Sequence, residues 1–209
     1  MSWIQRRRTE GYYRKAKKEG YRSRAVYKLK QIDEKYFLIR DGMRVLDLGA
    51  SPGGWSQYLS EVNSNGNNVA VDKQRMANIN GVSFILGDIF DEKTLKMIIY
   101  KSPEGYDLVL SDALMHTSGN KSVDQADAFF LAKGILEICK SVLVNGGKAL
   151  IKTLQGDLTD ELAREFEKYF SRVRITKPPS STQHSPEIYI LAEHFSKRPR
   201  YPETSQPPV

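Results

Sequence analysis

Short runs of apolar residues recur along the chain, and segments whose apolar residues follow helical spacing separate most of them. The runs that predict strands are 43–48, 68–72, 82–86, 106–112, 148–153, 173–176 and 187–193. Helical spacing predicts helices over 22–36, 55–63, 92–100, 123–143 and 159–170. We expect Ser23 to cap the first helix, and Gly146 and Gly147 to end the fourth. Strands that alternate with helices are typical of a parallel sheet with helices on both faces.

The last two apolar runs differ from the others because no helical pattern separates them. Only a loop around Pro178 and Pro179 lies between 173–176 and 187–193. A parallel crossover needs a longer connection, usually a helix, so these two strands should pair as a hairpin. The predicted fold is therefore an α/β sheet of seven strands, mostly parallel, with the last strand antiparallel and helices on both faces.

Length and composition indicate one soluble domain. The 209 residues suit a single core, which we place at 22–195, between a basic arm over 1–21 and a proline-rich tail over 196–209 that we expect to be disordered. No apolar run approaches the roughly 18 residues that span a bilayer, and the start does not resemble a secretion signal. A cytoplasmic monomer that does not use a membrane is expected.

Cys139 is the single cysteine, and it lies in a segment whose apolar residues follow helical spacing. Such a pattern predicts a buried structural thiol rather than a nucleophile or a metal ligand. No metal site is expected.

Positive charge is concentrated at the start of the chain. The net charge is +7, whereas residues 1–30 hold eleven basic and two acidic residues, a net charge of +9, interleaved with aromatic rings. Cations that meet phosphates and rings that stack on bases suit a single-stranded nucleic acid, although a merely solvated tail is the alternative. The residues expected to bind RNA are Arg6, Arg7, Arg8, Arg14, Lys17, Lys18, Arg22 and Arg24.

Polar residues and one glycine collect where the predicted strands end. In a parallel sheet, ligands bind beyond the carboxyl ends of the strands. An antiparallel last strand begins at that same edge, so its first residue joins the group. The residues expected to converge there are Gly49, Asp72, Asp88, Asp112, Lys152 and Glu187.

The turn after the first strand reads G-A-S-P-G-G over 49–54. It lacks both the G-x-G-x-x-G dinucleotide fingerprint and the G-x-x-x-x-G-K-[ST] phosphate loop, which disfavours a nicotinamide dehydrogenase and a nucleoside triphosphatase. Asp72 is placed to accept from ribose hydroxyls, and Asp88 to accept from an adenine amino group. A glycine turn and a ribose acid without a phosphate fingerprint indicate S-adenosylmethionine, the alternative being a turn that only packs helix against strand.

Several motifs together resemble the FtsJ/RrmJ family of ribose 2′-O-methyltransferases, from about Tyr12 to Glu193. They are RSRAVYKL (22–29), DLGASPGGWSQYL (47–59), AVD (70–72), GDI (87–89), LSD with SG (110–119), GGKALIK (146–152), Q-G (155–156) and KP-SS with S-E-I-Y (177–189). The resemblance implies the seven-stranded Rossmann-like methyltransferase fold. Its most specific part is the ordered set Lys28, Asp112, Lys152 and Glu187, which matches the family's K-D-K-E tetrad.

The resemblance also implies a reaction, the transfer of a methyl group from S-adenosylmethionine to a ribose 2′-hydroxyl of RNA. Lys152 would accept the hydroxyl proton, Lys28 would orient the hydroxyl or stabilise the developing oxyanion, and Glu187 would anchor Lys28. The cofactor would be bound by Gly49, Gly53, Trp55, Asp72, Asp88, Ile89 and Asp112.

By analogy with different members of the family, the resemblance implies as target a uridine of large-subunit ribosomal RNA or, alternatively, a tRNA anticodon loop. A non-enzymatic RNA-binding protein would explain the basic arm but not the residues that converge at the sheet edge. The chain departs from the family at Met115 and His116, and at Thr182, in two loops expected to face the RNA. His116 is a weaker candidate base, because a lone loop histidine is more often a surface residue.

Overall fold

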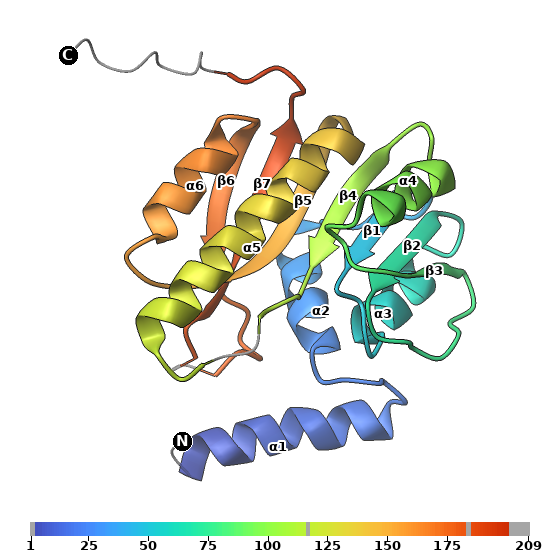
Figure 1. Ribbon diagram of the computed structural model, residues 1–209. Coiled ribbons are helices and arrows are strands. Elements are labelled where there is room, and N and C mark those ends of the chain that lie inside the picture. Colours follow the sequence, from blue (N-terminus) through green and yellow to red (C-terminus); the bar gives the residue numbers. More distant parts are fainter. Residues whose placement is uncertain (1–2, 116–117, 183–184, 201–209) are drawn as a thin grey trace, which may run out of the picture.

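The computed structural model describes residues 3–115, 118–182 and 185–200, and it contains a seven-stranded sheet with the order β3-β2-β1-β4-β5-β7-β6 (Figure 1). The strands are β1 Arg44–Leu48, β2 Asn67–Asp72, β3 Val82–Leu86, β4 Tyr106–Ser111, β5 Leu143–Leu154, β6 Phe170–Thr176 and β7 Glu187–Phe195. Strands β1 to β5 pair in parallel, whereas β7 is antiparallel to both β5 and β6. The predicted fold class and the antiparallel last strand are confirmed.

The order of the strands creates one edge at which distant segments meet. From β1 the chain moves outward to β2 and β3 and then returns to β4 on the other side of β1. The carboxyl ends of β1 and β4 therefore flank the switch point, where doubly wound sheets bind ligands. Because β7 runs the other way, Glu187 opposes Leu154 at the carboxyl end of β5.

Helices cover both faces of the sheet (Figure 1). They are α1 Trp3–Lys18, α2 Val26–Tyr36, α3 Gly54–Val62, α4 Glu92–Lys101, α5 Lys121–Val142 and α6 Thr159–Glu167. Alternate strand residues point to opposite faces, so Leu46 and Leu48 pack in the core beneath α5, whereas Val45 packs with residues of α2 and α3. The nearly continuous apolar sequence of the central strands follows from this burial on both faces.

Three predicted boundaries differ from the structure. The first domain helix begins at Val26 rather than at residue 22, and Ser23 does not cap it; a side chain at Gly54 would meet the Ser23 hydroxyl, so Ser23 packs on α3. Gly146 and Gly147 lie inside β5 at an irregularity of its pairing with β4, because the helix already ends at Val142. The predicted helix 159–170 ends at Glu167, since Phe170 is already the first residue of β6.

Residues 3–18 and 196–200, on either side of the domain, are both described by the structure. Most of the basic arm forms α1, which crosses beneath the carboxyl edge of the sheet in Figure 1. Two residues of α1 pack against the domain. Ala16 is buried, and the ring of Tyr12 lies 5.2 Å from the ring of Tyr27. Residues 196–200 of the expected disordered tail hydrogen-bond to the backbone of Tyr169 and Lys168. The rest of that tail, 201–209, lies outside the described residues.

Within the described ranges, none of the helices combines the length and the apolar character needed to cross a bilayer.

Candidate active site

Four side chains from four elements meet at the carboxyl edge of the sheet. The amine of Lys28, from α2, donates to Glu187 of β7 over 2.8 Å and lies 3.9 Å from Oδ1 of Asp112. The amine of Lys152, from β5, lies 3.2 Å from the same Oδ1. The parallel register that pairs Ser111 with Ile151 brings Asp112 and Lys152 side by side. Three of the six residues expected to converge at this edge, Asp112, Lys152 and Glu187, are therefore connected with Lys28 in one cluster.

Tyr189 completes this cluster, although it was not among the expected site residues. It lies directly opposite Lys152 in the antiparallel ladder, and its fully buried hydroxyl donates to Oδ1 of Asp112 over 2.6 Å. Burial, together with the charge of Asp112, raises the pKa of this phenol well above its ordinary value, so it stays a donor. The alternation of a strand places residues 187 and 189 on one face, a signal that the sequence already contained.

The charged side chains of the two lysines in the cluster are almost fully buried from solvent. Lys28 is 8% exposed and Lys152 is 7% exposed, and a charge that is removed from water is tolerated only when it is paired. Burial alone would raise the pKa of Glu187, but the charges of Lys28, Lys152 and Arg24 and the Lys28 hydrogen bond outweigh it and hold that pKa below its ordinary value. Glu187 is therefore an ionised partner that fixes Lys28.

Asp72 provides a preoriented carboxylate beside the glycine turn. Its Oδ2 accepts from the backbone N–H of Ser51 over 2.9 Å, and its Oδ1 accepts from that of Gln74 over 2.7 Å. Each carboxylate oxygen can accept more than one hydrogen bond, so both keep capacity for a ligand hydroxyl. This geometry suits a pair of ribose hydroxyls.

The glycines of the turn allow neighbouring segments of the chain to approach its backbone closely. Gly49 has φ +73°, and a Cβ there would lie 2.6 Å from the Cβ of Ala113. Gly53 has φ +106°, and its Cβ would lie 2.9 Å from Nη1 of Arg22. Both positions thus require glycine for backbone conformation and for close approach of neighbouring segments. The turn is tightly enclosed by residues distant in the sequence.

The other residues expected at the cofactor site are placed less uniformly. Asp88 is exposed and accepts from the backbone N–H of Phe90, whereas Ile89 is half-buried against the core. Trp55 is only 3% exposed; its indole N–H donates to the carbonyl of Ala25, and its ring packs against Tyr189. Because little of the Trp55 ring is exposed, we infer that Trp55 supports Tyr189 by packing against its ring and does not line the surface that a ligand would contact.

Asp47 is a second residue that the sequence reasoning did not single out. It is buried in β1 and accepts from the hydroxyl of Ser56 over 2.6 Å. Burial, with smaller effects from Asp112 and Asp72, raises the pKa of Asp47 to about 7. A carboxyl within an otherwise apolar strand next to the glycine turn is the signal that could have identified it.

The residues expected to bind RNA fall into three groups. Arg14, Lys17 and Lys18 are exposed on α1, where Arg14 pairs with Glu10. Arg22 is held by backbone carbonyls, and Arg24 is close enough to Glu187 to affect its pKa. The side chains of Arg6, Arg7 and Arg8 lie outside the described part of the structure.

The two loops that were expected to face the RNA follow β4 and β6. Met115 is exposed, whereas His116 lies outside the described residues. Thr182 is half-buried and follows Ser180 and Ser181, whose side chains are buried. The backbone N–H of Ser180 donates to Gln31 of α2, so this loop is attached to the helix that carries Lys28.

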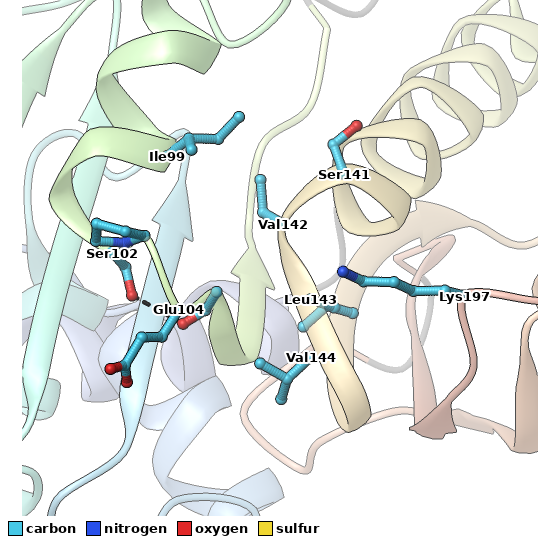
Figure 2. Close-up of a pocket in the computed structure, with 10 residues that line it drawn as sticks. Ile99, Ser102, Glu104, Ser141, Val142, Leu143, Val144 and Lys197 are labelled. Carbon is cyan, nitrogen blue, oxygen red and sulfur yellow. Dashed lines mark hydrogen bonds between the residues drawn. The ribbon is translucent and has the colours of Figure 1, made fainter.

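A small cavity of about 80 Å³ lies at the opposite edge of the sheet, where β4 and β5 begin (Figure 2). Its lining includes Ser102, Val142 and Lys197 and none of the clustered residues. It plays no part in the chemistry of the carboxyl edge.

The arrangement can be compared with known proteins. A family model described as FtsJ-like methyltransferase matches residues 21–195. The chain belongs to the FtsJ-like methyltransferase family. The expected family resemblance is thereby confirmed.

Relatives within the FtsJ-like family cover nearly the whole chain. A protein of Methanothrix thermoacetophila named ribosomal RNA large subunit methyltransferase E is 44% identical over 188 residues, which are 90% of this chain and 73% of that protein. A protein of the same name from Legionella pneumophila is 42% identical over 196 residues, covering 93% and 95% of the two chains. A crystal structure of a ribosomal RNA methyltransferase from Plasmodium falciparum has a TM-score of 0.75 at 32% identity, over 84% of this chain and 98% of that one.

The FtsJ-like family implies S-adenosylmethionine as the methyl donor, and the residues present fit this group. Asp72 offers acceptors for the ribose, and the carboxylates of Asp72 and Asp112 at this edge suit a cationic sulfonium. The G-A-S-P-G-G turn has no lysine in the position of a phosphate loop. The donor set therefore suits a cationic nucleoside better than a polyphosphate.

Proposed function

We propose that this protein transfers a methyl group from S-adenosylmethionine to the 2′-hydroxyl of a ribose in RNA, at a uridine of large-subunit ribosomal RNA. The observation that carries the proposal is the buried cluster of Lys28, Asp112, Lys152 and Glu187 at the switch point. It lies at the same edge of the sheet as Asp72, and the basic helix α1 crosses below that edge in Figure 1. RNA methylation requires three features in one place. They are a carboxylate that binds the cofactor, groups that can accept a proton and a cationic surface for the RNA.

Lys152 is the proposed proton acceptor. When bound, the cofactor supplies a methyl group that its sulfonium already activates, so the chain's own residues must align the ribose hydroxyl and remove its proton. The ribose oxygen would take the methyl group as the C–S bond of the sulfonium breaks and a neutral thioether leaves. The hydroxyl proton would pass to Nζ of Lys152, which must enter the step as the neutral amine. Asp112 and Tyr189 fix the amine in place through Oδ1 of Asp112.

Lys28 is proposed to stabilise the negative charge that develops on the ribose oxygen. Its hydrogen bond to Glu187 fixes the direction of the ammonium before substrate arrives, as electrostatic preorganisation requires. With Lys152 neutral, one cation and two carboxylates leave the cluster with one net negative charge. That charge complements the positive sulfonium beside it.

The basic helix α1 is proposed to hold the RNA by its phosphates. Its exposed residues Arg14, Lys17 and Lys18 lie on the helix that crosses the carboxyl edge, and Arg6, Arg7 and Arg8 precede them along the same segment. Arg24, near Glu187, would contact the nucleotide closest to the reacting ribose. Phosphate contacts of this kind position a strand without reading its bases.

Ribosomal RNA is preferred as the substrate because two relatives, 44% and 42% identical to this chain, are named ribosomal RNA large subunit methyltransferase E. A tRNA anticodon loop is the competing target, and the experiment below separates the two.

The experiment supplies radiolabelled S-adenosylmethionine with large ribosomal subunits, with deproteinised ribosomal RNA or with total tRNA. We expect label in ribosomal RNA and, after nuclease digestion, in 2′-O-methyluridine. Label in tRNA alone would replace the substrate, and label on a base would overturn the ribose assignment. RNA binding without any transfer would favour the non-enzymatic alternative.

A further inference from the structure

The guanidinium of Arg22 donates to backbone carbonyls of two loops that are distant in the sequence. Nη1 donates to the carbonyls of Ala77 over 2.6 Å and of Pro52 over 3.4 Å, and Nη2 donates to that of Asn78 over 2.8 Å. Pro52 belongs to the glycine turn after β1, whereas residues 77 and 78 belong to the segment after β2. One side chain therefore joins the two loops that follow neighbouring strands.

These two loops also lie on either side of the Asp72 carboxylate, and they form what we call the walls of the candidate cofactor site. The glycine turn is attached to Oδ2 of Asp72 through Ser51, and the segment after β2 is attached to Oδ1 through Gln74. Asp72 thus ties the loops together at the sheet, and Arg22 ties them together farther out. With both ties in place, the spacing between the walls is fixed before any ligand enters.

The room for Arg22 exists because residue 53 is glycine. A Cβ at Gly53 would lie 2.9 Å from Nη1 of Arg22 and 3.0 Å from Cδ1 of Ile79. The backbone of Arg22 is fixed as well: its N–H donates to Oε1 of Gln57 over 2.7 Å, while Nε2 of Gln57 donates to the carbonyl of Gly20. The segment that leaves α1 is thereby fastened to the helix that follows the glycine turn.

We propose that Arg22 is a positioning residue for the cofactor and not a phosphate ligand for RNA. The inference rests on the proposed function, since it assigns Arg22 to the S-adenosylmethionine site described above. The three hydrogen bonds to carbonyls engage both Nη1 and Nη2 of the guanidinium, so a phosphate would have to compete for donors that already have partners. Because a planar guanidinium reaches several acceptors at once and an ammonium acts as a point charge, lysine cannot take over this role.

The test compares Arg22→Ala and Arg22→Lys with the wild type in two binding measurements. Calorimetry measures the Kd of S-adenosylmethionine, and fluorescence anisotropy measures the Kd of a labelled single-stranded oligouridine. We expect both variants to raise the cofactor Kd about tenfold or more and to leave the oligouridine Kd within about twofold. Arg24→Ala is the matched control, two residues away, and should show the opposite pattern.

Hydrogen exchange followed by mass spectrometry separates positioning from general destabilisation. In the Arg22→Lys variant, exchange should rise in 50–53 and 73–80 and stay unchanged in the strands of the sheet. Uniformly faster exchange would mean that Arg22 only stabilises the fold.

Two results would overturn the role of Arg22 while leaving the enzyme assignment intact. One is a cofactor Kd that neither variant changes while the wild type binds normally. The other is a loss of oligouridine affinity in Arg22→Ala that Arg22→Lys restores, which is the behaviour of a phosphate contact. A wild-type protein that does not bind S-adenosylmethionine would overturn the proposed function itself, and the role of Arg22 with it.

Discussion

Oδ1 of Asp112 organises the candidate site at the scale of single residues. It receives the hydroxyl of Tyr189 at 2.6 Å and lies 3.2 Å from Nζ of Lys152 and 3.9 Å from Nζ of Lys28. Two amines and a phenol are therefore placed relative to one another by a single acceptor. A displacement of Asp112 would change its spacing to all three groups, and Trp55 contributes to the alignment through the contact of its ring with Tyr189.

Lys152 gives the sharpest test of the proposed chemistry. Lys152→Ala should retain cofactor binding yet lose a factor of about 10² or more in single-turnover methyl transfer, the usual scale for a positioned general base. Lys152→Arg should fail as well, because a guanidinium stays protonated and cannot accept a proton. The wild-type rate should rise with pH along a basic limb that the Ala variant lacks.

The matched control for this test is Lys148→Arg, four residues earlier on β5, where the side chain pairs with Glu193 outside the cluster. It should transfer methyl groups at the wild-type rate. If Lys152→Arg were equally active, Lys152 would be a positioning group and another residue would take the proton.

Asp47 predicts an unusual dependence of stability on pH. Its pKa is raised from 3.8 to about 7, so between those values the folded chain keeps a proton that the unfolded chain releases. The free energy of unfolding should therefore fall as pH rises through that window, by on the order of 4 kcal/mol for this group alone. Asp47→Asn should remove the fall and raise the Tm at pH 8, while its amide oxygen still accepts from Ser56.

Asp107 provides the opposite case for the same thermal scans. The hydrogen bond from Arg44 lowers the pKa of Asp107, so its contribution is present above the ordinary carboxyl pKa and is lost as pH falls through the folded-state value. Asp107→Asn should therefore lower the Tm at pH 7.

If the free energy of unfolding of Asp47→Asn depended on pH in the same way as that of the wild type, Asp47 would not hold the extra proton.

At the scale of elements, α1 is a cationic helix attached at its last turns. Lys17→Ala with Lys18→Ala should weaken binding of an oligouridine and reduce the slope of log K against log salt by up to about 1.4, since each phosphate contact on single strands contributes about 0.7. Lys101→Ala with Lys197→Ala, exposed lysines near the start of the parallel strands, is the control and should leave the slope unchanged. Equal slopes in both double variants would show that α1 does not engage phosphates.

The elements also show where local pattern stops being informative. Seven strands and the hairpin formed by β6 and β7 follow from apolar runs and from the absence of a helix between the last two. The start of α2 and the place of Gly146 were predicted wrongly, because Ser23 packs against Gly54 and because β5 begins before its glycines. Both outcomes depend on a neighbouring segment that local sequence does not include.

At the scale of the whole molecule, charge and site are concentrated on one edge. Residues 1–30 carry a net charge of +9, whereas the whole chain carries +7. The remainder of the chain is therefore slightly acidic. The basic helix and the carboxyl groups of the candidate cofactor site thus lie close together with opposite signs. A cationic cofactor and an anionic RNA can approach the same edge without competing for the same groups.

Cofactor binding should stabilise the whole fold by mass action. S-adenosylmethionine at about 100 times its Kd adds about 2.7 kcal/mol, which for a chain of this size raises the Tm by roughly 5–10 °C. Asp72→Asn should lose most of this shift in a thermal scan, whereas Asp41→Asn, before β1, should keep it. A full shift in Asp72→Asn would remove Asp72 from the cofactor site.

The sequence by itself determined the fold class, the edge of the sheet that carries the site and four charged members of the cluster. The fold class, the edge and the positions of Asp112, Lys152 and Glu187 follow from short-range periodicity and from the rule that parallel strands end on a common edge. Lys28 was expected only from the resemblance to the FtsJ/RrmJ family. Only the tertiary structure decided that Tyr189 joins Asp112, that Trp55 supports the site from within and that Arg22 bridges two loops. Such contacts depend on side-chain directions and on packing between segments far apart in the chain, which the spacing of residues along a sequence does not encode.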